Sequence, residues 1–219
     1  MPEFRALLDG YRRFRSGPYS DQRARYDALA NQGQSPKVMV IACSDSRVDP
    51  TIVFDAAPGQ MFVVRNVANL VPPYEPAGGQ HGASAAIEYA VTQLEVHHVV
   101  VFGHGLCGGI QASLSGAFDD VEIGEGKFIG RWMAMIRPAR DQVRAAAALS
   151  PDIDAQRALE QAAIRLSLAN LMSFPFVAER VEDGRLKLQG AHFAITEGLL
   201  RVLDPETDRF EPVEIDWAA

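Results

Sequence analysis

Cysteine is scarce in this sequence, because Cys43 and Cys107 are the only two among 219 residues. A disulfide framework normally uses four or more cysteines in a shorter chain, so that class of protein is excluded. In a reducing compartment, two distant cysteines are free thiols, catalytic groups or metal ligands. The surroundings of these two thiols are therefore the first place to look for chemistry.

Positive charge is also in short supply. The chain has 21 basic and 28 acidic residues, which gives a net charge of -7. Its densest basic cluster is Arg12, Arg13 and Arg15, a short run typical of the solvated face of a helix rather than of a nucleic-acid surface. An acidic protein is also repelled by anionic membranes. We therefore expect neither nucleic acid nor a membrane among the partners.

Long hydrophobic runs are lacking too. The strongest apolar stretch, 99–102, is far shorter than the ~18 residues of a membrane-spanning helix. The first residues do not have the basic-then-apolar layout of a signal peptide, so we expect a cytoplasmic protein. With 47% apolar and 22% charged residues, the composition is that of a globular chain and excludes disorder.

Short apolar runs alternate with helical patterns along the chain. Three runs have strand length and are apolar throughout, as in strands buried on both faces of a parallel sheet. They are 38–42, 61–64 and 99–102. The pattern also predicts helices and, near the end, hairpin-like strands. The helices are 4–16, 21–32, 82–94, one from about 110, 131–149, 153–171 and 175–182, and the late strands lie near 185–189, 192–196 and 199–203.

This alternation predicts an α/β fold with a central, largely parallel β-sheet flanked by helices and an N-terminal helical arm. A length of 219 residues favours one domain. We expect that domain to cover 1–219, with 1–32 as the helical arm and 33–219 as the catalytic α/β core.

Two of the three buried strands end in potential metal ligands. Cys43 ends the first strand, and His104 and Cys107 follow the third. Ligands bind outside the carboxyl ends of parallel strands, so we expect these three side chains to lie together. Two thiolates and an imidazole suit Zn2+. Three protein ligands with a vacant fourth position are typical of a catalytic zinc site, whereas structural sites use four ligands.

Two charged residues follow Cys43 closely. Asp45 could fill the fourth position itself, or it could accept a hydrogen bond from a water on the metal. Arg47 could bind Asp45 through two parallel hydrogen bonds and hold it off the metal. A purely structural ion pair is the third interpretation, and the spacing alone does not separate the three.

The motif around these residues resembles a known family. Cys43-Ser44-Asp45-Ser46-Arg47, followed further along by His104-x-x-Cys107-Gly108-Gly109, is similar to the signature of the β-class carbonic anhydrases, most of all their plant-type branch. The resemblance is strong over 30–110. It departs from the family at Gly105, where serine is frequent, and at Gly190-Ala191-His192-Phe193, which matches only in part.

The resemblance implies a carbonate dehydratase, a zinc lyase that hydrates carbon dioxide reversibly to bicarbonate and a proton by attack of zinc-bound hydroxide. Cys43, His104 and Cys107 would bind the zinc. Asp45 and Arg47 would form a catalytic dyad, and the plant-like features favour an open site in which Asp45 does not bind the metal.

The family also implies a substrate site shared between two chains. Gln34 would donate a hydrogen bond to CO2 or bicarbonate, the N–H of Gly108 would contact the substrate, and an apolar pocket across a dimer interface would be lined by Phe62, Val67 and Tyr89. We therefore expect a homodimer or a higher even homo-oligomer. An apolar stripe on the arm is available to bury against a partner: Phe4, Leu7, Leu8 and Tyr11.

Two other functions stay open. Hydrolysis of COS or CS2 on the same scaffold would use the same ligands and differ in access to the pocket. A zinc-binding sensor or structural protein without turnover would keep the metal and lack the reaction.

Overall fold

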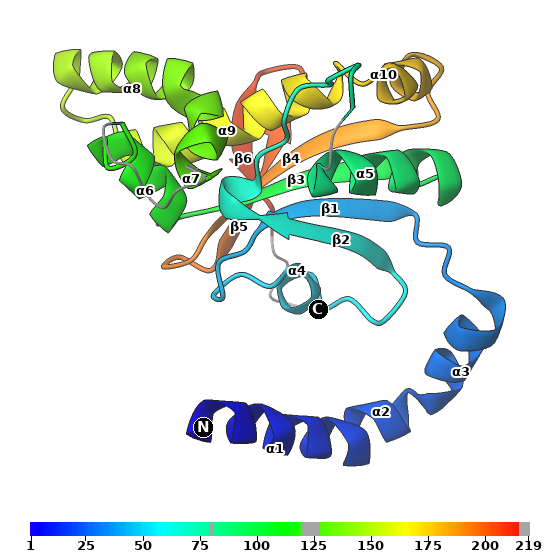
Figure 1. The fold of residues 1–219 in the computed structure, drawn as a ribbon. Helices are drawn as coiled ribbons and strands as arrows, with labels where there is room; N and C mark the ends of the chain where they lie inside the picture. Colours follow the sequence, from blue (N-terminus) through cyan, green and yellow to red (C-terminus); the bar gives the residue numbers. More distant parts are fainter. Residues whose placement is uncertain (79–80, 120–127, 215–219) are drawn as a thin grey trace.

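A single sheet organises the molecule. The computed structural model describes residues 1–78, 81–119 and 128–214. Within these ranges six strands lie in the order β2-β1-β3-β4-β5-β6 (Figure 1). Their bounds are β1 Val38–Cys43, β2 Met61–Asn66, β3 His98–His104, β4 Lys187–Ala194, β5 Leu199–Asp204 and β6 Arg209–Pro212. The strands β2, β1, β3 and β4 pair in parallel, and β5 and β6 add antiparallel pairs at one edge.

Helices precede, connect and flank these strands. The first three are α1 Pro2–Ser16, α2 Pro18–Asp21 and α3 Arg23–Gln32. Between the strands come α4 Pro50–Val53, the 3-10 turn η1 Val67–Asn69, α5 Gly82–Glu88 with its π-helical continuation η2 Tyr89–Gln93, α6 Gly108–Ser115, α7 Phe128–Met133, the 3-10 turn η3 Ala134–Ile136, α8 Arg137–Leu149, α9 Ala155–Leu171 and α10 Pro175–Glu182. The predicted α/β fold with a largely parallel sheet and an N-terminal helical arm is confirmed.

The two faces of the sheet are covered differently. The helices α5, α9 and α10 lie over one face, where Met39 and Ile41 of β1 are fully buried against them (Figure 1). On the opposite face, Val40 and Ala42 belong to a cluster that includes Val53 of the short helix α4. Since successive strand residues point to opposite faces, an apolar run such as β1 is explained by burial on both sides.

The late strands differ from the prediction. The stretches 185–189 and 192–196 are not two strands of a hairpin, because one strand, β4, spans Lys187–Ala194 and pairs in parallel with β3. Gly190 lies inside that strand and not in a turn. A Cβ there would approach Ile164 of α9 to 2.8 Å, so glycine allows the helix to pack closely on the sheet. The strand β6 was not predicted.

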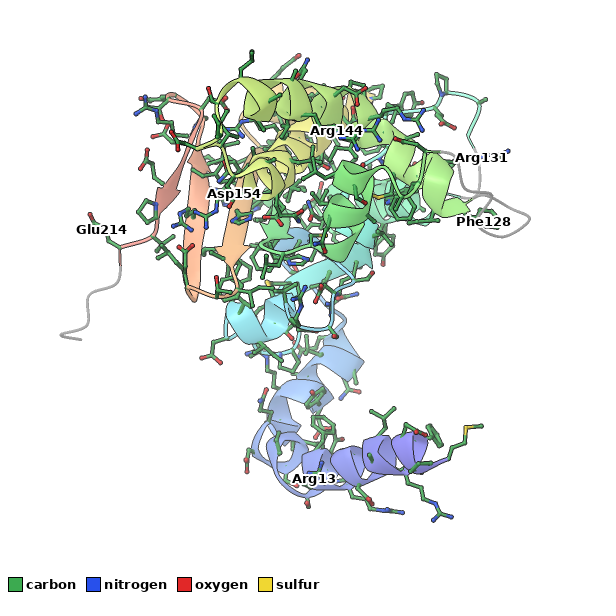
Figure 2. The ribbon with its side chains drawn as sticks, turned by 90° about the vertical axis from the view of Figure 1, so that its left-hand side faces the viewer. Arg13, Phe128, Arg131, Arg144, Asp154 and Glu214 are labelled. Carbon is green, nitrogen blue, oxygen red and sulfur yellow. The ribbon has the colours of Figure 1, made fainter. Side chains whose placement is uncertain are left out.

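The first helix of the arm lies apart from the sheet (Figure 2), whereas Arg25 of α3 donates to the carbonyl of Pro58 in the core. Figure 2 shows the first helices projecting away from the sheet, with Arg13 labelled on α1. None of the residues of α1 is buried within the described chain, and Phe4, Leu7 and Tyr11 are 60%, 69% and 59% exposed. A helix stabilised by tertiary packing normally buries its apolar face, and this one leaves it open. In the parts of the chain that the structure describes, every helix is too short or too polar to cross a bilayer.

Candidate metal centre

The strand order creates a crevice beside β1. This strand lies between β2 and β3, so the chain leaves it towards one neighbour and later returns to pair on its other side. Ligands bind at such a switch point, outside the carboxyl ends of the strands. Cys43 is the last residue of β1 and His104 is the last residue of β3. The backbone topology therefore brings the two ends of these strands together.

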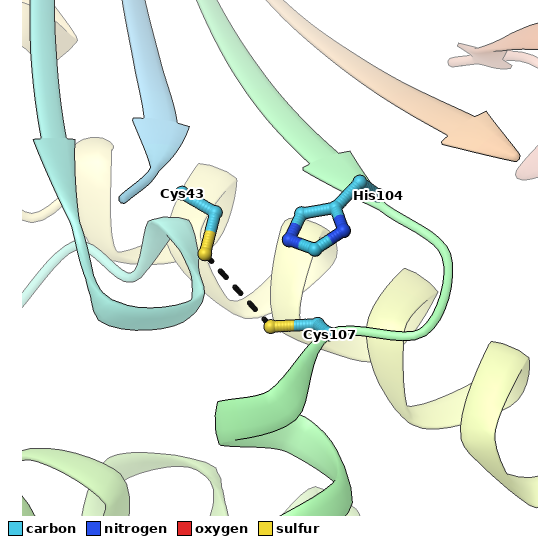
Figure 3. A group of neighbouring side chains, drawn as sticks. All are labelled: Cys43, His104 and Cys107. Atoms are coloured by element: carbon cyan, nitrogen blue, oxygen red, sulfur yellow. Dashed lines mark hydrogen bonds between the residues drawn. The ribbon is translucent and has the colours of Figure 1, made fainter. Parts of the chain in front are cut away.

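Three potential metal ligands meet in this crevice (Figure 3). The sulfur atoms of Cys43 and Cys107 are 3.9 Å apart, and these sulfurs and a ring nitrogen of His104 all lie within 4.8 Å of one another. All three residues are buried, with 5%, 1% and 2% of their surface exposed for Cys43, His104 and Cys107. Atoms at this separation can be bridged by one ion, because Zn–S and Zn–N bonds are about 2.0–2.3 Å long.

The ring of His104 is oriented for ligation through one nitrogen. Its Nδ1 lies 2.9 Å from the carbonyl oxygen of Gly105, which places the proton on Nδ1. Its Nε2 is buried and has no hydrogen-bond partner among the residues that the structure describes. A buried nitrogen with a free lone pair is costly unless something binds it, and a histidine held in this way is typical of metal ligands.

The two thiols interact strongly with each other. Their hydrogen bond is the main cause that lowers the pKa of Cys43 to about 4, and it also raises the pKa of Cys107, whose burial acts in the same direction. The backbone N–H groups of Gly109 and Ile110, at the start of α6, lower the pKa of Cys107 in part. Two buried sulfurs this close become thiolates together only when a cation compensates their charge. The donor set therefore fits a divalent soft-to-borderline metal such as zinc.

Asp45 and Arg47 form a paired group at the edge of the crevice. Arg47 donates from Nε to Oδ1 at 2.9 Å and from Nη2 to Oδ2 at 2.7 Å, and its backbone N–H also donates to Oδ1 at 2.9 Å. These hydrogen bonds hold the pKa of Asp45 well below its usual range. Oδ2 lies 3.9 Å from Nε2 of His104, so the carboxylate faces the same space as the three ligands.

Arg65 supports the loop that carries this pair, and sequence reasoning missed it. It is the second-last residue of β2, beside β1. It donates from Nε to the carbonyl of Cys43 at 2.9 Å and from Nη2 to the carbonyl of Asp45 at 2.6 Å. Its Nη1 binds Asp49, the cap of α4, at 2.9 Å. The available signal was an arginine directly after the apolar run 61–64.

Two of the predicted substrate residues lie near the ligands. Gly108 begins α6 directly after Cys107 and is exposed, and the N–H groups of a first helical turn have no acceptor within the helix. Val67 follows β2 and lines an open cavity of about 640 Å3 together with Ser44, Ile129 and Trp132. Trp132 fixes one wall by donating from Nε1 to the carbonyl of Val67 at 2.8 Å.

The other three predicted substrate residues lie near the amino-terminal ends of the strands, away from the ligands. Phe62 pairs with Met39 and Asn66 pairs with Cys43, so Phe62 lies four residues, or about 13 Å, back along its strand from the level of Cys43. The Tyr89 ring is 5.8 Å from that of Phe62. Gln34 precedes β1 and is exposed. One chain therefore does not bring Gln34, Phe62 and Tyr89 to its own ligands.

Comparisons with known proteins agree on one family. A family model described as carbonic anhydrase matches residues 38–200. The chain is 36% identical to beta carbonic anhydrase 3 of Arabidopsis thaliana over 192 residues. This match covers 88% of this chain and 73% of that protein.

Solved structures give the same result. The β-carbonic anhydrase CcaA aligns with a TM-score of 0.87 at 29% identity, covering 98% of this chain and 94% of that one. A structure from a study of two tetrameric β-carbonic anhydrases of Sordaria macrospora aligns with a TM-score of 0.74 at 29% identity, covering 93% and 98%. With the Cys43, His104 and Cys107 group at the carboxyl ends of its central strands, this chain belongs to the β-carbonic anhydrases, a family of lyases.

Proposed function

We propose that the protein hydrates carbon dioxide reversibly to bicarbonate and a proton, with one zinc ion held by Cys43, His104 and Cys107. The observation that carries this proposal is the buried group of two sulfurs and one imidazole nitrogen, within 4.8 Å of one another, in a chain of this family. Three protein donors leave a tetrahedral ion one position for water or substrate. A bound zinc ion supplies a Lewis acid that lowers the pKa of a water molecule to about 7.

Asp45 acts on that water through its carboxylate. Arg47 occupies both carboxylate oxygens from one side, which favours an Asp45 that accepts a hydrogen bond over one that binds the metal. A carboxylate whose pKa is held low stays ionised across the neutral range, so it remains a hydrogen-bond acceptor there. We therefore propose the open form of the site, in which the fourth position of the metal is free near pH 7.

Carbon dioxide is apolar and needs an apolar pocket with few polar contacts. We propose that Val67 and the N–H of Gly108 serve the chain in which they lie, because both flank its ligands. Gln34, Phe62 and Tyr89 lie near the amino-terminal ends of β1 and β2, away from the ligands of their own chain, which supports their serving the ligands of a second chain. Two identical chains related by a two-fold axis complete two such sites at once.

This arrangement makes the active protein a homodimer or a higher even homo-oligomer. The exposed apolar face of α1 supports the same conclusion, because it has no partner within the described chain. Carbonic anhydrases of Sordaria macrospora are described as tetrameric, and that relative is structurally similar over most of both chains.

The test combines metal analysis with turnover. We expect one zinc ion per chain by elemental analysis and rapid CO2 hydration in a stopped-flow indicator assay at neutral pH. Zinc at one per chain without hydration would contradict the proposal in favour of a sensor or structural protein. Turnover of COS or CS2 that exceeds that of CO2 in parallel assays would reassign the substrate.

A further inference from the structure

A buried acid–imidazole pair lies behind the metal ligands, and the proposed function does not use it. We propose that Glu160, fixed by His192 and assisted by Gln156, is a positioning residue that holds the backbone of Cys107 and so keeps its sulfur in place for the metal. This inference rests on the proposed zinc site and adds the residues that determine how firmly that site retains its ion.

Glu160 and Gln156 hold the peptide groups on both sides of Cys107. Oε1 of Glu160 accepts the N–H of Cys107 at 3.1 Å and a hydrogen bond from Nε2 of Gln156 at 2.7 Å. The same Gln156 nitrogen also lies 3.2 Å from the carbonyl oxygen of Cys107. The orientation of Cys107 at the start of α6 is therefore set by two side chains of α9, a helix about fifty residues further along the chain.

His192 holds the second oxygen of the same carboxylate. Its Nε2 lies 2.9 Å from Oε2 of Glu160, and a carboxylate accepts, so Nε2 donates. Both residues are buried, with 0% of His192 and 3% of Glu160 exposed. With one oxygen bound to His192 and the other to Cys107 and Gln156, the carboxylate cannot rotate without losing a charge-assisted hydrogen bond.

The packing of α9 explains how these groups meet. Ile164 fits against Gly103 and Gly190, where an added Cβ would come within 2.8 Å of its side chain. Glu160 and Gln156 lie one and two turns earlier on the same face of the helix. In the β3–β4 register His192 lies opposite Gly103, so its ring points to the face that α9 covers. Because α9 packs closely on the sheet at these two glycines, the carboxylate of Glu160 lies near the end of β3.

The loop that carries Cys107 needs such support. Leu106 has a positive φ of 57°, a conformation that a branched side chain adopts only at a cost. Arg47 holds this loop from the other side by donating to the carbonyl of Leu106 at 2.9 Å. The loop is therefore held by Arg47 of the proposed dyad on one side and by Glu160 on the other.

A purely structural role would not call for a carboxylate here. Burying a charge is expensive unless it is fully paired, and a well-packed apolar residue of similar size often stabilises a core as much or more. The partners of Glu160 are the backbone of a metal ligand and a histidine that fixes the acid. Groups that orient metal ligands in this way typically change metal affinity by 10–100-fold when they are removed.

The test measures how fast the zinc-loaded enzyme loses its metal to excess EDTA. The zinc that has left the protein is measured after the protein is removed by filtration. In Glu160→Leu the release should be at least about tenfold faster than in the wild type. In Glu160→Gln an oxygen acceptor for the N–H of Cys107 remains, so its rate should lie between these two. Cobalt-substituted Glu160→Gln should also show shifted thiolate-to-cobalt absorption bands, because the sulfur has moved.

Leu171→Ala is the matched control. Leu171 is buried on the same helix but belongs to a cluster away from the metal ligands, so this variant loses stability without touching the Cys107 loop. Equal release rates in Glu160→Leu and Leu171→Ala variants of similar melting temperature would overturn the inference. If Glu160→Leu does not fold, Gln156→Ala carries the test, because Gln156 is only half-buried. Wild-type zinc retention in Gln156→Ala would then overturn the inference, whereas a wild type that binds no zinc would overturn the proposed function as well.

Discussion

Arg47 binds both oxygens of the Asp45 carboxylate, at 2.9 Å and 2.7 Å, while Oδ2 stays 3.9 Å from the unpartnered nitrogen of His104. The carboxylate is thus directed to the ligand crevice and restrained from one side. This geometry favours one of the three interpretations that the sequence left open. In the proposed open site, a restrained Asp45 would accept a hydrogen bond from the water, whereas a free Asp45 would compete with that water for the metal.

The first prediction concerns the charge of Asp45. Replacing Asp45 by Asn should lower kcat/KM for CO2 hydration by about 100-fold or more, because a neutral amide is a weaker acceptor than a carboxylate for the hydrogen bond that the water donates. Zinc should remain at one per chain, since Asp45 is not a ligand in the open site. Stopped-flow rates and elemental analysis on one preparation check both parts.

Asp55→Asn is a suitable control for that experiment. Asp55 is exposed, lies in the same connection between β1 and β2, and has a positive φ of 45° that asparagine tolerates. Its rate should match that of the wild type. Wild-type turnover in zinc-loaded Asp45→Asn would remove Asp45 from the mechanism.

The metal site was predictable because each of its ligands follows an apolar run that the sequence marks as a strand. Cys43 ends an apolar run, and His104 and Cys107 directly follow another. The carboxyl ends of adjacent parallel strands must meet. The structure brings the three side chains together where the carboxyl ends of β1 and β3 meet, as expected from that rule. The helical arm and the parallel core were predictable for the same reason, since hydrophobic periodicity reports them directly.

Other features depend on packing between distant segments. In the sequence, Glu160 is one more polar residue of an amphipathic helix. Only the packing of Ile164 against Gly103 and Gly190 shows where its carboxylate lies. The same fit explains the error at β4, since a glycine inside a strand also resembles a turn. The roles proposed for Gln34, Phe62 and Tyr89 require a second chain, and hydrophobic periodicity carries no information about such a chain.

The second prediction tests this fit. Gly103→Ala should lower the free energy of unfolding by about 1–3 kcal/mol, because its Cβ would lie 2.8 Å from Cδ1 of Ile164. Adding Ile164→Val removes that atom and should recover part of the loss. Gly82→Ala is the control, since no atom of the described residues lies within 4 Å of a Cβ there. Urea unfolding measures all four proteins, and equal midpoints for the Gly103 and Gly82 variants would contradict the close packing.

The third prediction concerns pH and the ion pair between Asp119 and Arg140. Arg140 is buried and donates from Nη1 to Oδ1 of Asp119 at 2.6 Å, and this hydrogen bond lowers the pKa of Asp119. A folded-state pKa below the ordinary value of about 3.9 means that the folded protein binds fewer protons. The stabilisation is therefore present above about pH 4 and is lost as the pH falls further.

Asp119→Asn should accordingly lower the melting temperature at pH 7. Its difference from the wild type should shrink as the pH falls below about 4, because the carboxyl of the unfolded wild type is protonated near its ordinary pKa and that of the folded protein only at a lower pH. Thermal unfolding between pH 7 and pH 3 follows this convergence. Asp152→Asn, at an exposed position before α9, should leave the melting temperature unchanged. A constant difference between Asp119→Asn and wild type at every pH would contradict a charge-based contribution.

The last prediction joins the arm to catalysis. Phe4, Leu7 and Tyr11 expose 60%, 69% and 59% of their surface, and burial of such a side chain contributes about 1.5–3 kcal/mol. If a second chain covers them, replacing all three by serine should shift the sedimenting species towards the single chain. CO2 hydration should fall with it, because Gln34, Phe62 and Tyr89 would no longer reach the ligands of a partner.

Leu149→Ser, which changes an 86% exposed side chain on α8, should alter neither property. A wild type that sediments as one chain of 23.9 kDa with full activity would show that each chain completes its own site, and both the shared pocket and the role of the arm would then be wrong.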